Sequence, residues 1–267
     1  MDRLFANVIR RFRAWDAPSR FALLTALGLL LVTLLMIAFG SQNLRQPALM
    51  GFIGLIIVIQ VIFMWGNRGM VTPFTQAQRY YLAENFESAR QVLENLNVNG
   101  KADAQSLTLL GNIYRQLGML DESEEVLTKA LDLRPLDHFP LYGIGRTLLV
   151  KGQYHQAVDK IKLALDAGAP PIIQFDLGEA LYRLGKLDQA RLVLTAATDI
   201  SQEPHRALMS QYLLYRLGVG QPPASDLVAL GLPYWHDNAI RFQETPYGQM
   251  LADDIQQLQA FMEENKC

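Results

Sequence analysis

The chain has 267 residues and a formal net charge of −2, from 24 Lys and Arg against 26 Asp and Glu. This balance argues against nucleic-acid binding, which needs a concentrated basic face. The single cysteine, Cys267, excludes an internal disulfide, so the fold does not depend on an oxidising compartment.

Apolar residues are concentrated near the N-terminus. No charged residue lies between Arg20 and Arg45, and none lies between Arg45 and Arg68. After Arg68 the composition becomes that of an ordinary globular domain. We therefore expect the first part of the chain to lie in lipid and the rest in water.

Two uncharged runs, residues 21–40 and 47–65, are each long enough to cross a bilayer, because about 20 helical residues span about 30 Å. Both are apolar on every face, which argues against a buried soluble hairpin. The first run is too long for a signal peptide, and a second run follows it closely. The sequence predicts a transmembrane hairpin over residues 21–66.

Basic residues predict the orientation of this hairpin. Residues 1–20 carry five arginines, whereas the connector over residues 41–46 carries only Arg45. The positive-inside rule places both termini and the following domain in the cytoplasm, with the hairpin in a plasma or inner membrane. Residues 1–20 also form a basic amphipathic segment, and two interpretations fit it. It is either a short helix lying in the headgroup region or a signal that only sets topology.

The remainder of the chain repeats itself. Small residues recur at intervals of 34 and 33 residues in four sets: Gly111, Gly145 and Gly178; Gly118, Gly152 and Gly185; Ser123, Ala157 and Ala190; Ala130, Ala164 and Ala197. Two apolar stripes of helical spacing fit inside each period, with a glycine at the turn between them. Such helix pairs must stack, because each pair leaves an apolar face that only a neighbour can cover.

The pattern inside each period resembles the tetratricopeptide (TPR) family. Residues 104–137 supply Leu107, Leu110, Gly111, Tyr114, Gly118, Ser123, Leu127, Ala130 and Pro135; residues 138–170 supply Leu141, Gly145, Leu148, Gly152, Ala157, Ile161 and Ala164; residues 171–203 supply Leu177, Gly178, Leu181, Gly185, Ala190, Leu194 and Ala197. Residues 73–97 fit less well, since Glu84 replaces the turn glycine, and residues 204–218 supply one further helix. The resemblance implies an all-α fold with a TPR-like α-solenoid over residues 73–218.

The period is lost over residues 219–267. Pro222 with Pro223 and Gly231 to Pro233 predict breaks, so we expect an irregular segment. Thr245 followed by Pro246 then resembles a helix start. Its apolar stripe, Leu251, Ile255, Leu258 and Met262, predicts a C-terminal helix that caps the solenoid.

The TPR resemblance also implies a partner-binding groove lined by the first helix of each pair. The groove positions are Phe74, Gln78, Tyr81, Thr108, Asn112, Arg115, Tyr142, Arg146, Leu149, Phe175, Glu179, Tyr182, Arg183, Tyr212, Tyr215 and Arg216. Aromatic and Arg side chains dominate, as they do at binding hot spots, so we expect a helical or extended segment of another protein as the ligand. The alternative is that several of these rings pack between repeats. Chaperone C-terminus binding is doubtful, because Thr108 and Tyr142 replace the lysines of the family's carboxylate-binding set.

Residues for catalysis or metal binding are not apparent. None of the four histidines has a second histidine three or four residues later, and Cys267 stands at the chain end. The glycines keep the repeat period and form no phosphate-binding loop. His236 and Asp237 beside Trp235 have a structural interpretation. We predict no catalytic residue, no metal and no cofactor, and no enzyme.

These patterns favour a membrane-anchored TPR adaptor or scaffold that binds other proteins in the assembly or recruitment of a membrane complex. Its predicted partners are membrane-associated proteins and the lipid bilayer, without nucleic acid. The alternative is a permanent structural subunit of a large membrane complex. A third possibility is an enzyme with an unrecognised site in residues 219–267.

Overall fold

The computed structural model describes residues 15–67, 72–198, 200 and 203–264. The arginines predicted to set the orientation at positions 3 to 13, Arg68, the Met262 side chain and Cys267 lie outside the part whose side chains are described. The regular structure of the described residues is entirely helical, which confirms the all-α class. Contacts divide the chain into two units, Met1–Thr72 and Pro73–Cys267.

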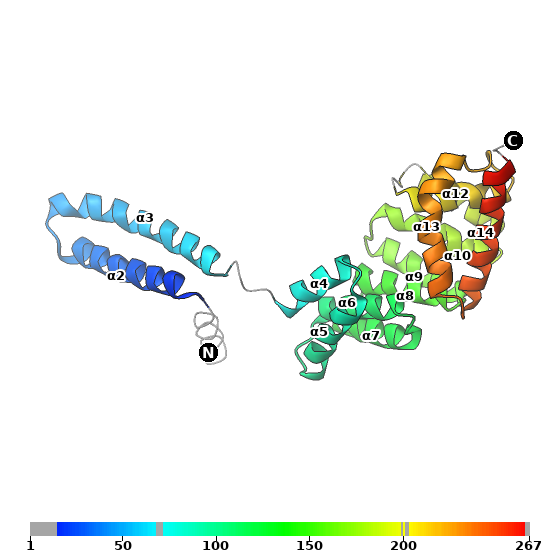
Figure 1. The fold of residues 1–267 in the computed structure, drawn as a ribbon. Helices are drawn as coiled ribbons and strands as arrows, with labels where there is room; N and C mark the ends of the chain where they lie inside the picture. The colour runs from blue at the N-terminus through cyan, green and yellow to red at the C-terminus, as the bar shows by residue number, and fades with distance from the viewer. Residues whose placement is uncertain (1–14, 68–71, 199, 201–202, 265–267) are drawn as a thin grey trace. The chain divides into compact units, whose positions relative to one another are not determined.

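The first unit is a hairpin of two long helices, α2 (Ala17–Phe39) and α3 (Gln42–Asn67) (Figure 1). Asp16 caps α2, because its carboxylate accepts the backbone N–H of Ser19. Small residues line the contact between the helices, where Ala26 and Ala48 are buried. The large apolar side chains of both helices are mostly exposed.

Trp15 closes one end of the hairpin. Its ring is 4% exposed and meets the ring of Phe63 edge-on, with centroids 5.5 Å apart. A side chain at Gly66 would lie 2.5 Å from the Trp15 ring, so only glycine fits there. The end of α2 is therefore held against the end of α3 by an aromatic contact.

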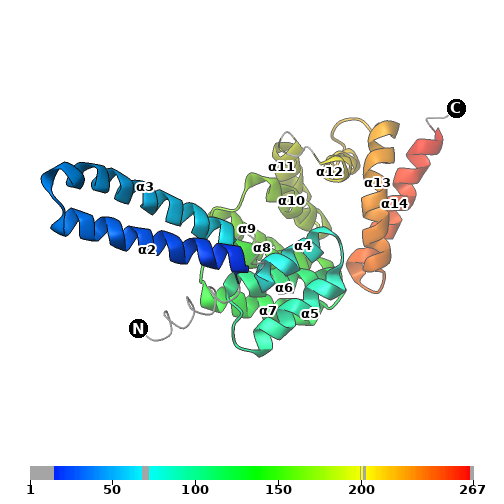
Figure 2. The same ribbon diagram turned by 60° about the vertical axis from the view of Figure 1, so that its left-hand side comes forward.

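The second unit begins with stacked helix pairs (Figures 1 and 2). The pairs are α4 (Pro73–Leu82) with α5 (Phe86–Val98), α6 (Ala104–Gln116) with α7 (Leu120–Leu133), α8 (His138–Val150) with α9 (Tyr154–Asp166), and α10 (Gln174–Arg183) with α11 (Leu187–Thr198), followed by α12 (Pro204–Arg216). A short 3₁₀ turn, η1 (Pro171–Ile173), precedes α10. Each pair packs on the next, so the predicted α-solenoid is confirmed.

The periodic small residues bring the helices of each pair close together. A Cβ on Gly111 would overlap the Leu127 side chain, and a Cβ on Gly178 would lie 2.6 Å from Leu194. Leu127 and Leu194 fill the space that these glycines leave, and both are fully buried. In the first pair Glu84 takes the turn position with φ 57°, a left-handed conformation that costs a non-glycine residue about 1 kcal/mol.

Two further helices follow, α13 (Ser225–Arg241) and α14 (Pro246–Glu264). The break expected from Gly231 to Pro233 does not occur, and α13 continues through Pro233. Gly231 packs closely against Leu208 of α12, and the indole N–H of Trp235 donates to the His205 carbonyl over 2.6 Å. These contacts outweigh the hydrogen bond that proline cannot donate.

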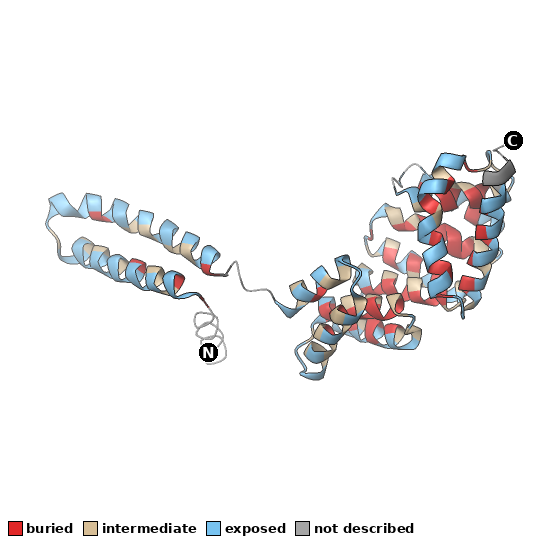
Figure 3. Cartoon of the chain, viewed as in Figure 1, coloured by how far each residue is buried: buried red, intermediate tan, exposed pale blue. Residues whose placement is uncertain are grey.

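One large core joins α8 to α14 (Figure 3). Its fully buried residues include Trp235 on α13 and Leu251 and Leu258 on α14. A smaller core lies under α4 to α7 and is centred on Leu93, Leu110 and Ile113. The two C-terminal helices are therefore part of the main body of the domain.

Candidate protein-binding face

The first helices of the pairs, α4, α6, α8, α10 and α12, form one face of the solenoid, which we name the inner face. All sixteen predicted groove residues lie on these five helices. Thr108, Asn112 and Arg115 show the spacing, since steps of four and three residues keep them on one side of α6. The structure nevertheless distributes the sixteen between very different environments.

Helices α13 and α14 cover the part of the inner face formed by α10 and α12. Tyr247 of α14 donates its hydroxyl to Glu179 over 3.0 Å, and Arg183 forms an ion pair with Asp254. The Tyr212 hydroxyl lies 3.1 Å from the same Asp254 carboxylate. The C-terminal helix therefore occupies the position where the sequence predicted a ligand.

The turn between α13 and α14 extends this cover toward the N-terminal repeats. Pro246 lies against the Gly152 turn, where an added Cβ would approach it to 3.1 Å. Arg241, at the end of α13, hydrogen-bonds to Gln116 at the end of α6 and lies 5.6 Å from the centre of the Phe86 ring. The α13–α14 hairpin thus crosses the solenoid from α12 to the edge of α6.

This cover divides the predicted groove residues. Those buried in the domain are Thr108, Arg115, Leu149, Phe175, Glu179 and Tyr212, together with the Arg183 side chain. Those at least partly exposed are Phe74, Gln78, Tyr81, Asn112, Tyr142, Arg146, Tyr182, Tyr215 and Arg216. The alternative interpretation, packing within the protein, describes Leu149, Phe175 and Tyr212.

Asp176 is the centre of a buried charge cluster beneath the inner face. Its side chain is 0% exposed, accepts the Tyr142 hydroxyl over 2.7 Å and forms ion pairs with Arg146 and Arg206. Burial favours the neutral acid, but the two guanidinium groups hold the pKa of Asp176 below its usual range. Sequence reasoning missed Asp176 and Arg206. The signal was available, since Tyr142 and Asp176 lie one repeat period apart on successive first helices.

Glu179 lies one turn further along α10 in a different environment. Its side chain is also 0% exposed, but its nearest cation, Arg183, is 3.5 Å away and is shared with Asp254. Burial raises the pKa of Glu179, and its second carboxylate oxygen has no hydrogen-bond partner among the described residues. Sequence reasoning missed Tyr247 and Asp254, because no local pattern on α14 indicates which helix it will meet.

Arg115 differs from Arg146, Arg183 and Arg206, the other arginines that lie mostly buried beneath the inner face. It is 8% exposed, and its guanidinium donates to the Asn112 side-chain oxygen over 2.8 Å. Within the described residues it forms no ion pair, whereas Arg146, Arg183 and Arg206 each pair with a carboxylate. Burial and the nearby charge of Arg146 lower the pKa of Arg115.

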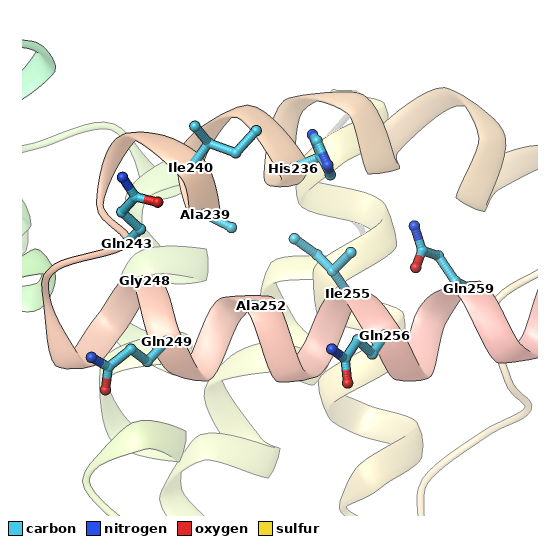
Figure 4. Close-up of a pocket in the computed structure, with 10 residues that line it drawn as sticks. All are labelled: His236, Ala239, Ile240, Gln243, Gly248, Gln249, Ala252, Ile255, Gln256 and Gln259. Carbon is cyan, nitrogen blue, oxygen red and sulfur yellow. The ribbon is translucent and has the colours of Figure 1, made fainter.

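A hollow that the sequence did not predict lies between α13 and α14 (Figure 4). It measures about 370 Å³ and is lined by His236, Ala239, Ile240, Gln243, Gly248, Gln249, Ala252, Ile255, Gln256 and Gln259. Alanine and isoleucine side chains supply its apolar part, and four glutamines supply its uncharged polar part. The described residues contain no group of three His, Cys, Asp or Glu side chains suited to a metal.

Stacked antiparallel helix pairs with small residues at their contacts define an α-solenoid repeat protein. Family models of the tetratricopeptide repeat match residues 104–135 and 142–203. These residues are therefore tetratricopeptide repeats.

The chain is similar to several solved structures. The crystal structure of TTC0263, a thermophilic TPR protein in Thermus thermophilus, has a TM-score of 0.51 at 16% identity, over 70% of this chain and 97% of that one. The APC/C hetero-tetramer Cut9–Hcn1 has a TM-score of 0.50 at 14% identity, over 85% of this chain and 45% of that one. MamA 41-end from Desulfovibrio magneticus RS-1 has a TM-score of 0.48 at 18% identity, over 72% of this chain and 94% of that one. No curated protein matches the chain in sequence.

Proposed function

We propose that the chain is a membrane-anchored TPR adaptor or scaffold that binds another protein in the assembly or recruitment of a membrane complex. The TPR fold is typically a non-catalytic protein-binding fold, which supports a binding role rather than an enzymatic one. The binding surface that we propose is the part of the inner face left uncovered by α13 and α14.

We name this surface the open inner face and define it by Phe74, Gln78, Tyr81, Asn112, Arg115 and Tyr142. The observation that carries the proposal is the division of the inner face. Helix α14 occupies α10 and α12 through Glu179 and Tyr212, whereas five of the six side chains that define the open inner face are at least partly exposed and only Arg115 is buried among them. Aromatic rings, an amide and a guanidinium together offer large apolar area and directional hydrogen bonds, the combination found at hot spots.

The membrane anchor is supported by the exposure of the first unit. Helices of 23 and 25 residues have the length and composition to cross a bilayer, and only 6% of each apolar window is buried. A core helix of a soluble protein is mostly buried, and neither helix of this hairpin is. Trp15 and Trp65 lie near the same end of the hairpin, as interfacial aromatic residues do.

A photo-crosslinking amino acid at Gln78 tests the binding surface in native membranes. Gln78 is exposed on α4 and lies on the open inner face, so we expect a discrete crosslinked protein band. Leu192 is 75% exposed on α11 and serves as the control position, where we expect no such band. Equal crosslinking from both positions, or none from Gln78, would contradict the proposed surface.

The stoichiometry of the crosslinked partner separates the two roles. A partner present in less than equimolar amount and released by salt indicates a transient adaptor, because polar and charged contacts weaken as salt rises. A partner that remains equimolar in high salt indicates a permanent structural subunit.

Cys267 offers a test of orientation, because it is the only thiol of the chain. With both termini and the repeat domain in the cytoplasm, a membrane-impermeant maleimide leaves Cys267 unlabelled in intact cells and labels it after the membrane is opened. Labelling of intact cells would place the repeat domain outside.

A further inference from the structure

Buried arginines normally lie beside an acid, because an unpaired charge loses its hydration without compensation. Arg146 and Arg206 share Asp176, and Arg183 is paired with Glu179 and Asp254. The carboxylates of Asp176, Glu179 and Asp254 therefore already have arginine partners. Within the described residues, Arg115 alone among the buried arginines of the inner face has a neutral partner, the Asn112 amide oxygen.

We propose that Arg115 is the receptor for an acidic side chain on the bound protein segment. This inference rests on the proposed function and names the chemistry of the partner at the open inner face. The guanidinium has five N–H donors, of which Asn112 accepts from one nitrogen, so donors remain for a two-pronged contact with a carboxylate.

The surroundings of Arg115 favour an anion further. The strongest electrostatic influences on it come from Arg146, Tyr81, Tyr142 and Tyr234, a cation and three phenols. Tyr81, Tyr142 and Tyr234 approach from three different helices, α4, α8 and α13. A carboxylate at this position would neutralise the surplus positive charge, and apolar side chains on either side of it would meet tyrosine rings.

Asn112 has the role of positioning the guanidinium. Its side-chain oxygen, which accepts from Arg115, would lie 3.3 Å from a Cβ added to Gly143 on α8, so the amide is packed between two helices. A fixed acceptor holds the guanidinium in one orientation before the ligand arrives. Such preorganisation reduces the entropy lost on binding.

Two peptides with a dye on the N-terminal nitrogen test the proposal with the full chain in detergent: dye-Phe-Glu-Leu-amide and dye-Phe-Gln-Leu-amide. They differ in one charge, and fluorescence anisotropy gives both dissociation constants. We expect the Glu peptide to bind about tenfold more tightly, which corresponds to about 1.4 kcal/mol. Arg115→Gln should reduce this preference to less than about twofold. Arg115→Lys should keep part of it, because lysine retains the charge but cannot form the bidentate contact of a guanidinium.

Arg79→Gln is the matched control. Arg79 is an exposed arginine on α4 outside the defined surface, and the Glu preference should survive its loss. Equal binding of the two peptides to the wild type, absence of binding by either, or an unchanged preference in Arg115→Gln would overturn the proposal. The proposal would also be overturned if inorganic phosphate displaced the Glu peptide at a lower concentration than acetate does, since the site would then prefer phosphate to a carboxylate.

Thermal unfolding without ligand supplies an independent readout. Arg115→Met removes an unpaired buried charge, so the Tm should stay the same or rise. Arg146→Met removes a partner of Asp176, and the Tm should fall by about 5 °C or more. A fall of similar size for Arg115→Met would show that Arg115 is structural. If the Glu preference is absent but Gln78 still crosslinks to a partner, this inference fails and the proposed function stands.

Discussion

Asp176 and Glu179 are one turn apart on α10, and both side chains are fully buried. Asp176 has two arginines and a tyrosine hydroxyl around it, whereas one oxygen of Glu179 has no hydrogen-bond partner in the described structure. A buried carboxylate stabilises a fold only when its partners replace the lost water. The removal of charge should therefore cost much more stability at Asp176 than at Glu179.

We predict that Asp176→Asn lowers the free energy of unfolding by about 3–5 kcal/mol, since it leaves two largely buried guanidinium groups without their carboxylate. Glu179→Gln keeps an acceptor for the Tyr247 hydroxyl and should change stability by less than about 1 kcal/mol at neutral pH. Thermal or denaturant unfolding measures both. A larger loss for Glu179→Gln than for Asp176→Asn would reverse the assignment of these roles.

The pH dependence of the two variants follows from the directions of the pKa shifts. The pKa of Asp176 is lower in the folded state, so its stabilisation is complete above the usual pKa of 3.8 and is lost as the pH falls through the folded value. The pKa of Glu179 is raised in the folded state, so the stability linked to it falls as the pH rises from 4.5 through the raised value. The Tm of Glu179→Gln relative to wild type should therefore increase with pH above 4.5.

The Tm of Asp176→Asn provides the opposite control. Its deficit relative to wild type should narrow as the pH falls below 3.8, because the wild-type Asp176 then also loses its charge. Parallel Tm curves for wild type and both variants over this range would show that neither carboxylate changes its protonation with folding.

The sequence predicted that the C-terminal helix caps the solenoid. Helix α14 instead lies against the inner face, where it contacts α10. Leu251 is fully buried in the core that includes α8, α10 and α12, and Asp254 on the same helix pairs with Arg183. An element that buries both apolar and ionic groups in the main core unfolds with the domain rather than separately. We regard α13 and α14 as permanent parts of the repeat domain.

We predict that Leu251→Ala lowers the free energy of unfolding by about 2–5 kcal/mol, the range found for fully buried leucines. Gln256→Ala on the exposed side of the same helix should leave it unchanged within about 0.5 kcal/mol. Native-state hydrogen exchange of the Leu251→Ala variant should show α10 and α14 losing protection together. Selective loss in α14 would identify a detachable helix instead.

Part of this element-level organisation was available from the sequence. The period of the small residues gave the helix pairs of residues 104–203, because Gly111 and Gly178 have to meet Leu127 and Leu194. The packing positions of α13 and α14 could not be predicted, since no repeat extends past Gly218. Gly231 appeared to break a helix because local propensity cannot show its contact with Leu208.

The whole molecule consists of two units that differ in where their apolar side chains lie. The helices of Met1–Thr72 expose large apolar side chains, while Pro73–Cys267 has its own extensive core. A chain starting at residue 73 should therefore be soluble without detergent, remain helical and unfold cooperatively. Gel filtration and circular dichroism measure this, with the full-length chain as the control, which we expect to require detergent. Aggregation of the shortened chain would show that the hairpin completes the repeat domain.

The site could be predicted only in part at this scale. The TPR resemblance gave the helices that line the inner face, because their positions follow from the repeat. It could not show that Tyr247 would contact Glu179, 68 positions away, or that Asp254 would contact Tyr212, 42 positions away. Long-range pairings of this kind leave no periodic trace in one sequence.

If the open inner face binds a protein segment as proposed, the cover formed by α13 and α14 also limits the length of that segment. Only α4, α6 and α8 contribute to the open inner face. Neighbouring helix axes lie about 8–10 Å apart, so this surface is about 20 Å long. An extended strand advances about 3.3 Å per residue, which leaves room for about six residues. A motif this short offers modest affinity in solution. Confinement of receptor and target to the same bilayer would then make up the difference through their high local concentration.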